Sequence, residues 1–157
     1  MKKNTKALLA SLALPLALGG LGSLLTRKGM AAFPALRQPP LSPPGWLFPV
    51  VWTGLYLAMG WAAWRVWRRR EQKPEAGAAL RLYALQLGAN FLWPLVFFGL
   101  HWYLVSFFWL VGLWVLVLRT MLAFAEIDSL AGDLLFPYLL WITFAGYLNF
   151  GIYVLNK

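Results

Sequence analysis

The side chains able to do chemistry in this sequence are few, and their kinds exclude most conventional active sites. The chain has one histidine, five acidic residues and no cysteine. Thiolate chemistry, disulfides and cysteine-based metal sites are therefore excluded, and we find no metal-ligand spacing, no Ser/His/Asp grouping and no glycine-rich phosphate loop. No acidic residue falls in the middle of an apolar stretch, so neither a paired-carboxylate site nor a proton relay is predicted. The acidic residues are Glu71, Glu75, Glu126, Asp128 and Asp133.

Of these groups, Glu126 and Asp128 are expected to cap or terminate helices. His101 is expected at a membrane boundary, where an interfacial or loop role is favoured over catalysis. No conventional enzyme and no metal site are therefore predicted. Any chemistry would come from a bound ligand or from oxidisable indole rings.

Polar residues within long apolar stretches are better candidates for a site, because each must find a partner or face a cavity. Gln86, Asn90 and Trp93 are spaced i, i+4 and i+7, which places them on one face of a helix. Two other apolar stretches carry similar stripes: Trp52, Tyr56 and Met59 in the first, and Tyr138, Trp141, Ala145 and Asn149 in the second. We expect the stripes to converge on a pocket in which rings stack on a flat apolar ligand and a few donors orient it. The alternative is that the amides only hydrogen-bond neighbouring helices.

The elements that position these stripes are membrane-spanning helices. Apolar residues make up 61% of the 157 residues, charged residues only 12%, and the mean hydropathy is +0.65. A helix needs about 20 apolar residues to cross a hydrocarbon core of about 30 Å. A break at His101 and Trp102, beside Gly99, divides the longest apolar run. The sequence therefore predicts one all-α membrane domain over residues 1–157, a bundle of five helices over 7–26, 46–67, 80–100, 103–125 and 134–155.

The first of these segments also resembles a secretory signal peptide. We favour a membrane span, because the apolar run continues through Gly19, Gly20 and Gly22 to Leu25 without a clear cleavage site.

Basic residues cluster at the ends of the apolar runs, so the net charge of +9 points to an anionic lipid surface rather than to nucleic acid. The positive-inside rule places the N-terminus in the cytoplasm and the C-terminus outside. The predicted inner face carries Lys2, Lys3, Lys6, Arg65, Arg68, Arg69, Arg70, Lys73, Arg81 and Arg119, and the outer face carries Arg27, Lys28, Arg37 and Lys157.

Two features outside the stripes bear on function. The loop 27–45 carries five prolines, so it is expected to be neither helix nor flexible linker, and it serves either as a lid over the bundle or as a rigid tether. Ala84 and Gly88 form a small-xxx-small pair on the helix face away from Gln86. That pair packs either against a second copy of the chain or within the monomer.

Several motifs resemble the translocator protein family (TspO/MBR), also called tryptophan-rich sensory proteins or peripheral-type benzodiazepine receptors, in its bacterial form. They are PPLSPPGW over residues 39–46, VWTGLY over 51–56, QLGANFLWP over 86–94, PYLLW over 137–141 and LN over 148–149. The motifs run from the first loop to near the C-terminus in the family's order and spacing.

The resemblance implies a five-helix bundle, often a homodimer, with a pocket beneath the first loop. Implied ligands are tetrapyrroles such as protoporphyrin IX and haem, cholesterol, and benzodiazepine-type or isoquinoline compounds, with no obligatory cofactor. The pocket positions that carry over are Trp52, Tyr56, Asn90, Trp93, Trp141 and Ala145. Trp52 and Trp141 match a pair implicated in light-dependent porphyrin breakdown in some bacterial members.

The chain departs from the family pattern at two places. Leu41 stands where the proline-rich loop usually has a tryptophan, for which Trp46 is the available substitute. Phe150 stands where the cholesterol-associated segment has a tyrosine, and the looser pattern formed by Leu148, Tyr153 and Lys157 is weak evidence for a sterol.

Three functions follow as expectations. The first is a membrane receptor, sensor or transporter that binds tetrapyrroles in the aromatic pocket. The second is a light- and oxygen-dependent porphyrin-degrading enzyme that uses Trp52 and Trp141. The third is a sterol-binding or scaffold protein that associates through Ala84 and Gly88.

Overall fold

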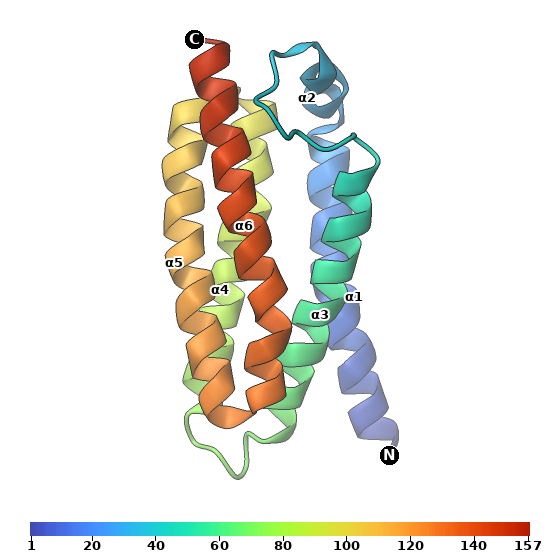
Figure 1. Ribbon diagram of the computed structural model, residues 1–157. Helices are drawn as coiled ribbons and strands as arrows, with labels where there is room; N and C mark the ends of the chain where they lie inside the picture. The colour runs from blue at the N-terminus through green and yellow to red at the C-terminus, as the bar shows by residue number, and fades with distance from the viewer.

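The computed structural model describes residues 1–157 and consists of helices joined by short connections (Figure 1). Five helical segments are long and apolar enough to cross a membrane, which confirms the predicted all-α bundle of five spans. The termini lie at opposite ends, which we call the N-terminal end and the C-terminal end of the bundle (Figure 1). The elements are α1 (Lys2–Leu25), α2 (Arg27–Ala32), η1 (Phe33–Ala35), α3 (Leu47–Arg68), α4 (Ala76–Pro94), η2 (Leu95–Gly99), α5 (Tyr103–Ile127) and α6 (Ser129–Leu155).

The break between the third and fourth spans has an unusual backbone. After Pro94 the chain widens into one π-helical turn, η2, in which the Leu100 N–H donates to the Leu95 carbonyl at 3.0 Å. His101 then adopts a positive φ of 57°, which lets the chain reverse before α5 begins at Tyr103. The break therefore lies where His101 and Trp102 indicated it.

The segment 27–45 differs from its expected irregular form, because its first part is helical. Arg27–Ala32 forms α2, and Phe33–Ala35 forms the single 3₁₀ turn η1. The prolines begin only at Pro34, which occupies one of the first positions of η1, where the missing N–H costs nothing. Only the residues after Ala35 follow the irregular path expected from the proline content.

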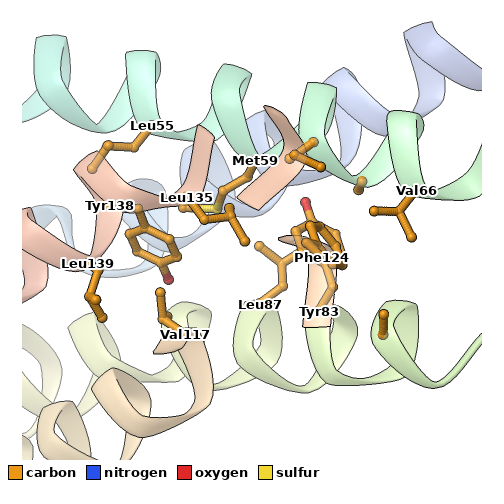
Figure 2. Packing of buried hydrophobic residues seen from close by; sticks show 14 of the residues in the cluster. Leu55, Met59, Val66, Tyr83, Leu87, Val117, Phe124, Leu135, Tyr138 and Leu139 are labelled. Carbon is orange, nitrogen blue, oxygen red and sulfur yellow. The ribbon is translucent and has the colours of Figure 1, made fainter. Parts of the chain in front are cut away.

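The core lies between α3, α4, α5 and α6. Its largest fully buried side chains include Met59, Phe124, Leu135 and Tyr138, and Figure 2 shows Met59, Leu135 and Tyr138 converging from α3 and α6. The first helix contributes little, since only Pro15 and Gly22 of α1 are buried. The centre of the bundle is therefore held by four helices, with α1 added to its side.

A charged cluster fastens the N-terminal end of the bundle. The Asp128 carboxylate caps α6 by accepting from the Leu130 and Ala131 N–H groups, as expected of a helix-capping residue. It also pairs with Arg65 at 3.0 Å and Arg69 at 3.2 Å, both on α3 or at its end. Burial raises the pKa of Asp128, but the hydrogen bonds from Arg65 and Ala131 and the two arginine charges outweigh it, so the net pKa is lowered.

Candidate ligand site among α3, α4 and α6

The polar residues of α4 belong to a hydrogen-bond chain that joins three helices. The Tyr56 hydroxyl on α3 donates to Asn90 Oδ1 at 3.3 Å, and Asn90 Nδ2 donates to the Tyr138 hydroxyl of α6 at 2.6 Å. The Tyr138 hydroxyl in turn donates to Gln86 Oε1 at 2.8 Å. The two amides thus bind helices together, as the alternative interpretation of the stripe anticipated.

The chain of donors ends without a partner at Gln86. Its Nε2 is buried and unpaired, and so is the hydroxyl of Tyr83, one turn away on α4. In Figure 2 the Tyr83 side chain extends from α4 toward α3. Gln86 is only 1% exposed, so its free N–H group lies deep in the core, away from any surface from which a ligand enters.

A second polar cluster lies nearer the C-terminal end. Trp93 Nε1 and the Ser106 hydroxyl both donate to Asn149 Oδ1, each at 3.1 Å. Asn149 Nδ2 donates to the Tyr103 carbonyl at 2.8 Å. Sequence reasoning missed Ser106, although a hydroxyl within an apolar span is the same signal that identified Gln86 and Asn90. This cluster joins α4, α5 and α6, and it engages both the oxygen and the nitrogen of the Asn149 amide.

The two tryptophans proposed for ring chemistry lie in aromatic groups on α3 and α6. The Trp52 ring centroid is 5.4 Å from that of Tyr56 and 6.2 Å from that of Tyr138. The centroids of the Trp141 and Phe48 rings are 6.0 Å apart, with the ring planes at 70° to each other. Phe48 was missed because it lies one turn before the stripe that begins at Trp52. Trp52, Trp141 and Ala145 are all partly buried and pack against the core.

The Trp141 indole carries a second unpaired group. Its Nε1 is buried and has no hydrogen-bond partner, while the indole rings of Trp93, Trp109 and Trp114 all donate to oxygen. A buried N–H without an acceptor costs about 1–3 kcal/mol. Among the predicted pocket residues, the Trp141 Nε1–H is therefore the donor best placed to gain a hydrogen bond from a bound ligand.

The proline-rich segment crosses the C-terminal end of the bundle and is fastened to α6. Asn156 accepts from the Arg37 N–H and donates to the Arg37 carbonyl, both at 2.9 Å, and the Tyr147 hydroxyl donates to the Pro40 carbonyl at 2.7 Å. The buried Pro39 ring lies on Gly151, where a Cβ would come within 2.6 Å of it. We call residues 36–46 the lid segment.

Neither Leu41, which replaces the family's loop tryptophan, nor Trp46, its available substitute, reaches the interior. Leu41 is 83% exposed and Trp46 67% exposed. The structure therefore favours an interfacial position for Trp46 over a substitute for the missing ring.

The predicted dimer face is open. Ala84 and Gly88 are exposed, and a Cβ added to Gly88 would meet nothing within 4 Å. Packing of this pair within the monomer is therefore not observed, and its contact with a second copy stays a prediction. No group of three or more His, Asp or Glu side chains is placed to hold a metal ion.

Fold and site together define an integral, multi-pass membrane protein with an aromatic and amide-rich interior. The model of the TspO/MBR family matches residues 11–155. The chain is 41% identical to the tryptophan-rich protein TspO of Chlorobaculum tepidum over 157 residues, 99% of each protein. It is 43% identical to the tryptophan-rich sensory protein of Cereibacter sphaeroides over 77% of this chain and 74% of that protein. It is 37% identical to the translocator protein of Bos taurus over 89% of this chain and 85% of the relative. The chain belongs to the TspO/MBR family, which confirms the resemblance found in its motifs.

Proposed function

We propose that this protein is a membrane receptor or transporter that binds a tetrapyrrole between α3 and α6, beneath the lid segment. The observation that carries the proposal is the unpaired Nε1 of Trp141, buried among aromatic rings. A carboxylate oxygen of the ligand supplies the missing acceptor. The faces of Trp52 and Trp141 supply apolar stacking surface, worth about 0.5–1.5 kcal/mol for each ring pair beyond the area that it buries.

Ligand entry requires movement, since the wall residues contact one another. Trp52 lies against Tyr56 and Tyr138, and Trp141 lies against Phe48. A macrocycle would therefore separate α3 and α6 at the C-terminal end of the bundle, where α3 begins and α6 ends, and displace the lid segment. The ion pairs of Asp128 hold α3 and α6 at the opposite end, so this separation would widen toward the lid.

The test is a titration of the detergent-purified protein with protoporphyrin IX, followed by quenching of tryptophan fluorescence and by the porphyrin absorbance. We expect Trp141→Phe to weaken binding about tenfold, because the ring is kept and one donor to the ligand is lost. The matched control is Trp61→Phe, since Trp61 is 41% exposed on α3 and lies outside the site. Equal affinities for wild type, Trp141→Phe and a Trp52→Phe/Trp141→Phe double variant would refute the site.

The contacts of Trp52 favour a second candidate function, light- and oxygen-dependent porphyrin degradation. Its indole lies beside the phenols of Tyr56 and Tyr138, and these are the side chains that most readily give up an electron to a photo-excited ligand. Illumination under air should then bleach the bound porphyrin in the wild type and more slowly in Trp52→Phe. Equal product in the dark or without oxygen would exclude this activity, while leaving the binding proposal intact.

A further inference from the structure

A cavity lies at the C-terminal end of the bundle, and neither Trp52 nor Trp141 is among its lining residues. Its volume is about 260 Å³, smaller than the range of about 300–1,000 Å³ usual for drug-sized ligands. The helix α2, whose position at this end is visible in Figure 1, forms one side of it, and η2 with the start of α5 forms the other. The lining residues are Gly29, Ala32, Phe33, Leu36, Phe97, Phe98, His101 and Tyr103.

The backbone beside this cavity is unusual in two ways. The π-helical turn η2 carries Phe97 and Phe98, and such turns are rare and frequent at functional sites. His101 follows with a φ of 57°, a conformation that costs a non-glycine residue about 1–3 kcal/mol and that clusters at ligand sites. The strained residue is the chain's single histidine, and it borders the cavity.

The helix α2, which forms one side of the cavity, packs closely against η2. Gly29 lies so close to the Phe98 carbonyl that a Cβ there would overlap it, which only glycine permits. The cavity therefore lies beside a close backbone contact between α2 and η2, which fixes the position of its α2 side.

The walls are aromatic. The Phe33 ring centroid lies 6.1 Å from that of Phe97 and 5.7 Å from that of Phe98, and the Phe97 and Phe98 rings are 4.8 Å apart, nearly perpendicular. Such an arrangement offers both ring faces and ring edges to a flat molecule. Its size suits one or two fused rings and excludes a tetrapyrrole.

The polar groups and nearby charges favour an anion. His101 and Tyr103 are the polar side chains of the lining, and the His101 Nδ1 lies 3.5 Å from the Tyr103 hydroxyl. The helix α2 begins with Arg27 and Lys28. Every acidic residue of the chain falls in the α3–α4 connection, at the end of α5, or at the start of α6, all at the N-terminal end. No acidic side chain at the C-terminal end therefore opposes a negative ligand.

We propose that this cavity binds a one- or two-ring aromatic carboxylate, with the ring held among Phe33, Phe97 and Phe98 and the carboxylate facing His101 and Tyr103. Neither Trp52 nor Trp141 lines this site. It adjoins the proposed tetrapyrrole site, because the Phe33 ring centroid lies 6.4 Å from that of Phe48, which lies 6.0 Å from that of Trp141. The Phe97 ring also stacks on that of Trp93, with the centroids 5.1 Å apart. Trp93 donates to Asn149, so a ligand that moves Phe97 would also disturb the polar cluster that joins α4 to α6.

The experiment uses 2-naphthoate as probe with the full chain in detergent, followed by isothermal titration, with naphthalene-2-methanol as a neutral probe of similar shape. We expect 2-naphthoate to bind at least about tenfold more tightly than the alcohol, because hydrogen bonds to a charged acceptor are the stronger kind. His101→Asn keeps a residue that tolerates positive φ and should weaken naphthoate binding about tenfold. Trp102→Phe is the control, since Trp102 is a neighbour outside the lining, 56% exposed.

Other outcomes overturn the proposal. Equal affinity for the two probes would refute the preference for an anionic ligand. An equal loss of affinity in His101→Asn and Trp102→Phe would refute a specific role of His101 in binding. Naphthoate binding that is lost in Trp141→Phe and kept in His101→Asn would place the probe in the other site. Protoporphyrin binding should stay unchanged in His101→Asn, so failure of this proposal and of the proposed function are separate results.

Discussion

Replacing Asn156 by alanine should release the lid segment from α6. The variant loses two hydrogen bonds to the Arg37 backbone, both 2.9 Å long. A typical hydrogen bond contributes about 0.5–1.5 kcal/mol net, and Arg37 is exposed, so water replaces part of the loss. We therefore expect a cost near the lower bound for the pair, about 1 kcal/mol, which corresponds to about a fivefold increase in the population of the open segment.

Two measurements check this expectation. Amide hydrogen exchange in residues 36–42 should quicken about fivefold in Asn156→Ala, in the local-opening regime, with exchange in the α5–α6 core unchanged. The association rate of protoporphyrin IX, followed by stopped-flow fluorescence, should rise by the same factor if the segment covers the entrance.

The comparison variant is Asn156→Asp, which keeps an oxygen for the Arg37 N–H and loses the amino group that donates to the Arg37 and Ile152 carbonyls, so part of the fastening should remain. Unchanged amide exchange in Asn156→Ala would refute the fastening. Faster exchange with an unchanged association rate would refute the role of the segment as a lid.

Three further predictions concern the core, the charged cluster and the open face. Tyr138→Phe leaves Gln86 Oε1 and Asn90 Nδ2 without partners, so the free energy of unfolding in detergent should fall by about 1–3 kcal/mol; a loss below about 0.5 kcal/mol would mean that the chain of hydrogen bonds stabilises little. The lowered pKa of Asp128 means that its carboxylate stabilises the fold above the ordinary value of about 4 and that this contribution is lost as pH falls through the lower folded-state pKa. Wild type should thus lose thermal stability below about pH 4 more steeply than Asp128→Asn, which cannot titrate, and parallel melting curves for the two proteins would contradict this. Gly88→Leu should leave the fold intact, since its Cβ meets nothing, and should reduce cross-linking between copies; undiminished cross-linking would exclude this face from the interface.

The sequence predicted the spanning helices well because their signal is local. Long apolar runs with basic ends need no knowledge of partners, and the break at His101 was visible beside Gly99. The i, i+4 and i+7 stripe of α4 correctly placed Gln86, Asn90 and Trp93 on a face that looks into the bundle, since each bonds another helix or is buried.

The sequence could not predict contacts between residues that are far apart along the chain. Arg65 and Arg69 were counted only as topology signals, because nothing local connects either of them with Asp128, which follows Arg65 by 63 residues. The π-helical turn η2 has no composition of its own, and the prolines of the loop concealed the helix α2 that precedes them. The cavity bordered by His101 lies where these two unforeseen elements meet.

The single-residue connection between α5 and α6 bears on how the chain enters the membrane. Asp128 alone separates Ile127 from Ser129, so the two helices form a tight hairpin with no loop between them. The carboxylate satisfies the first N–H groups of α6 within that turn, and its negative charge is met by arginines of α3, a helix that the ribosome has completed earlier. The arginines that Asp128 needs therefore precede the last hairpin in the chain, and a carboxylate that is only 4% exposed in the finished fold meets its positive partners as soon as that hairpin docks on α3.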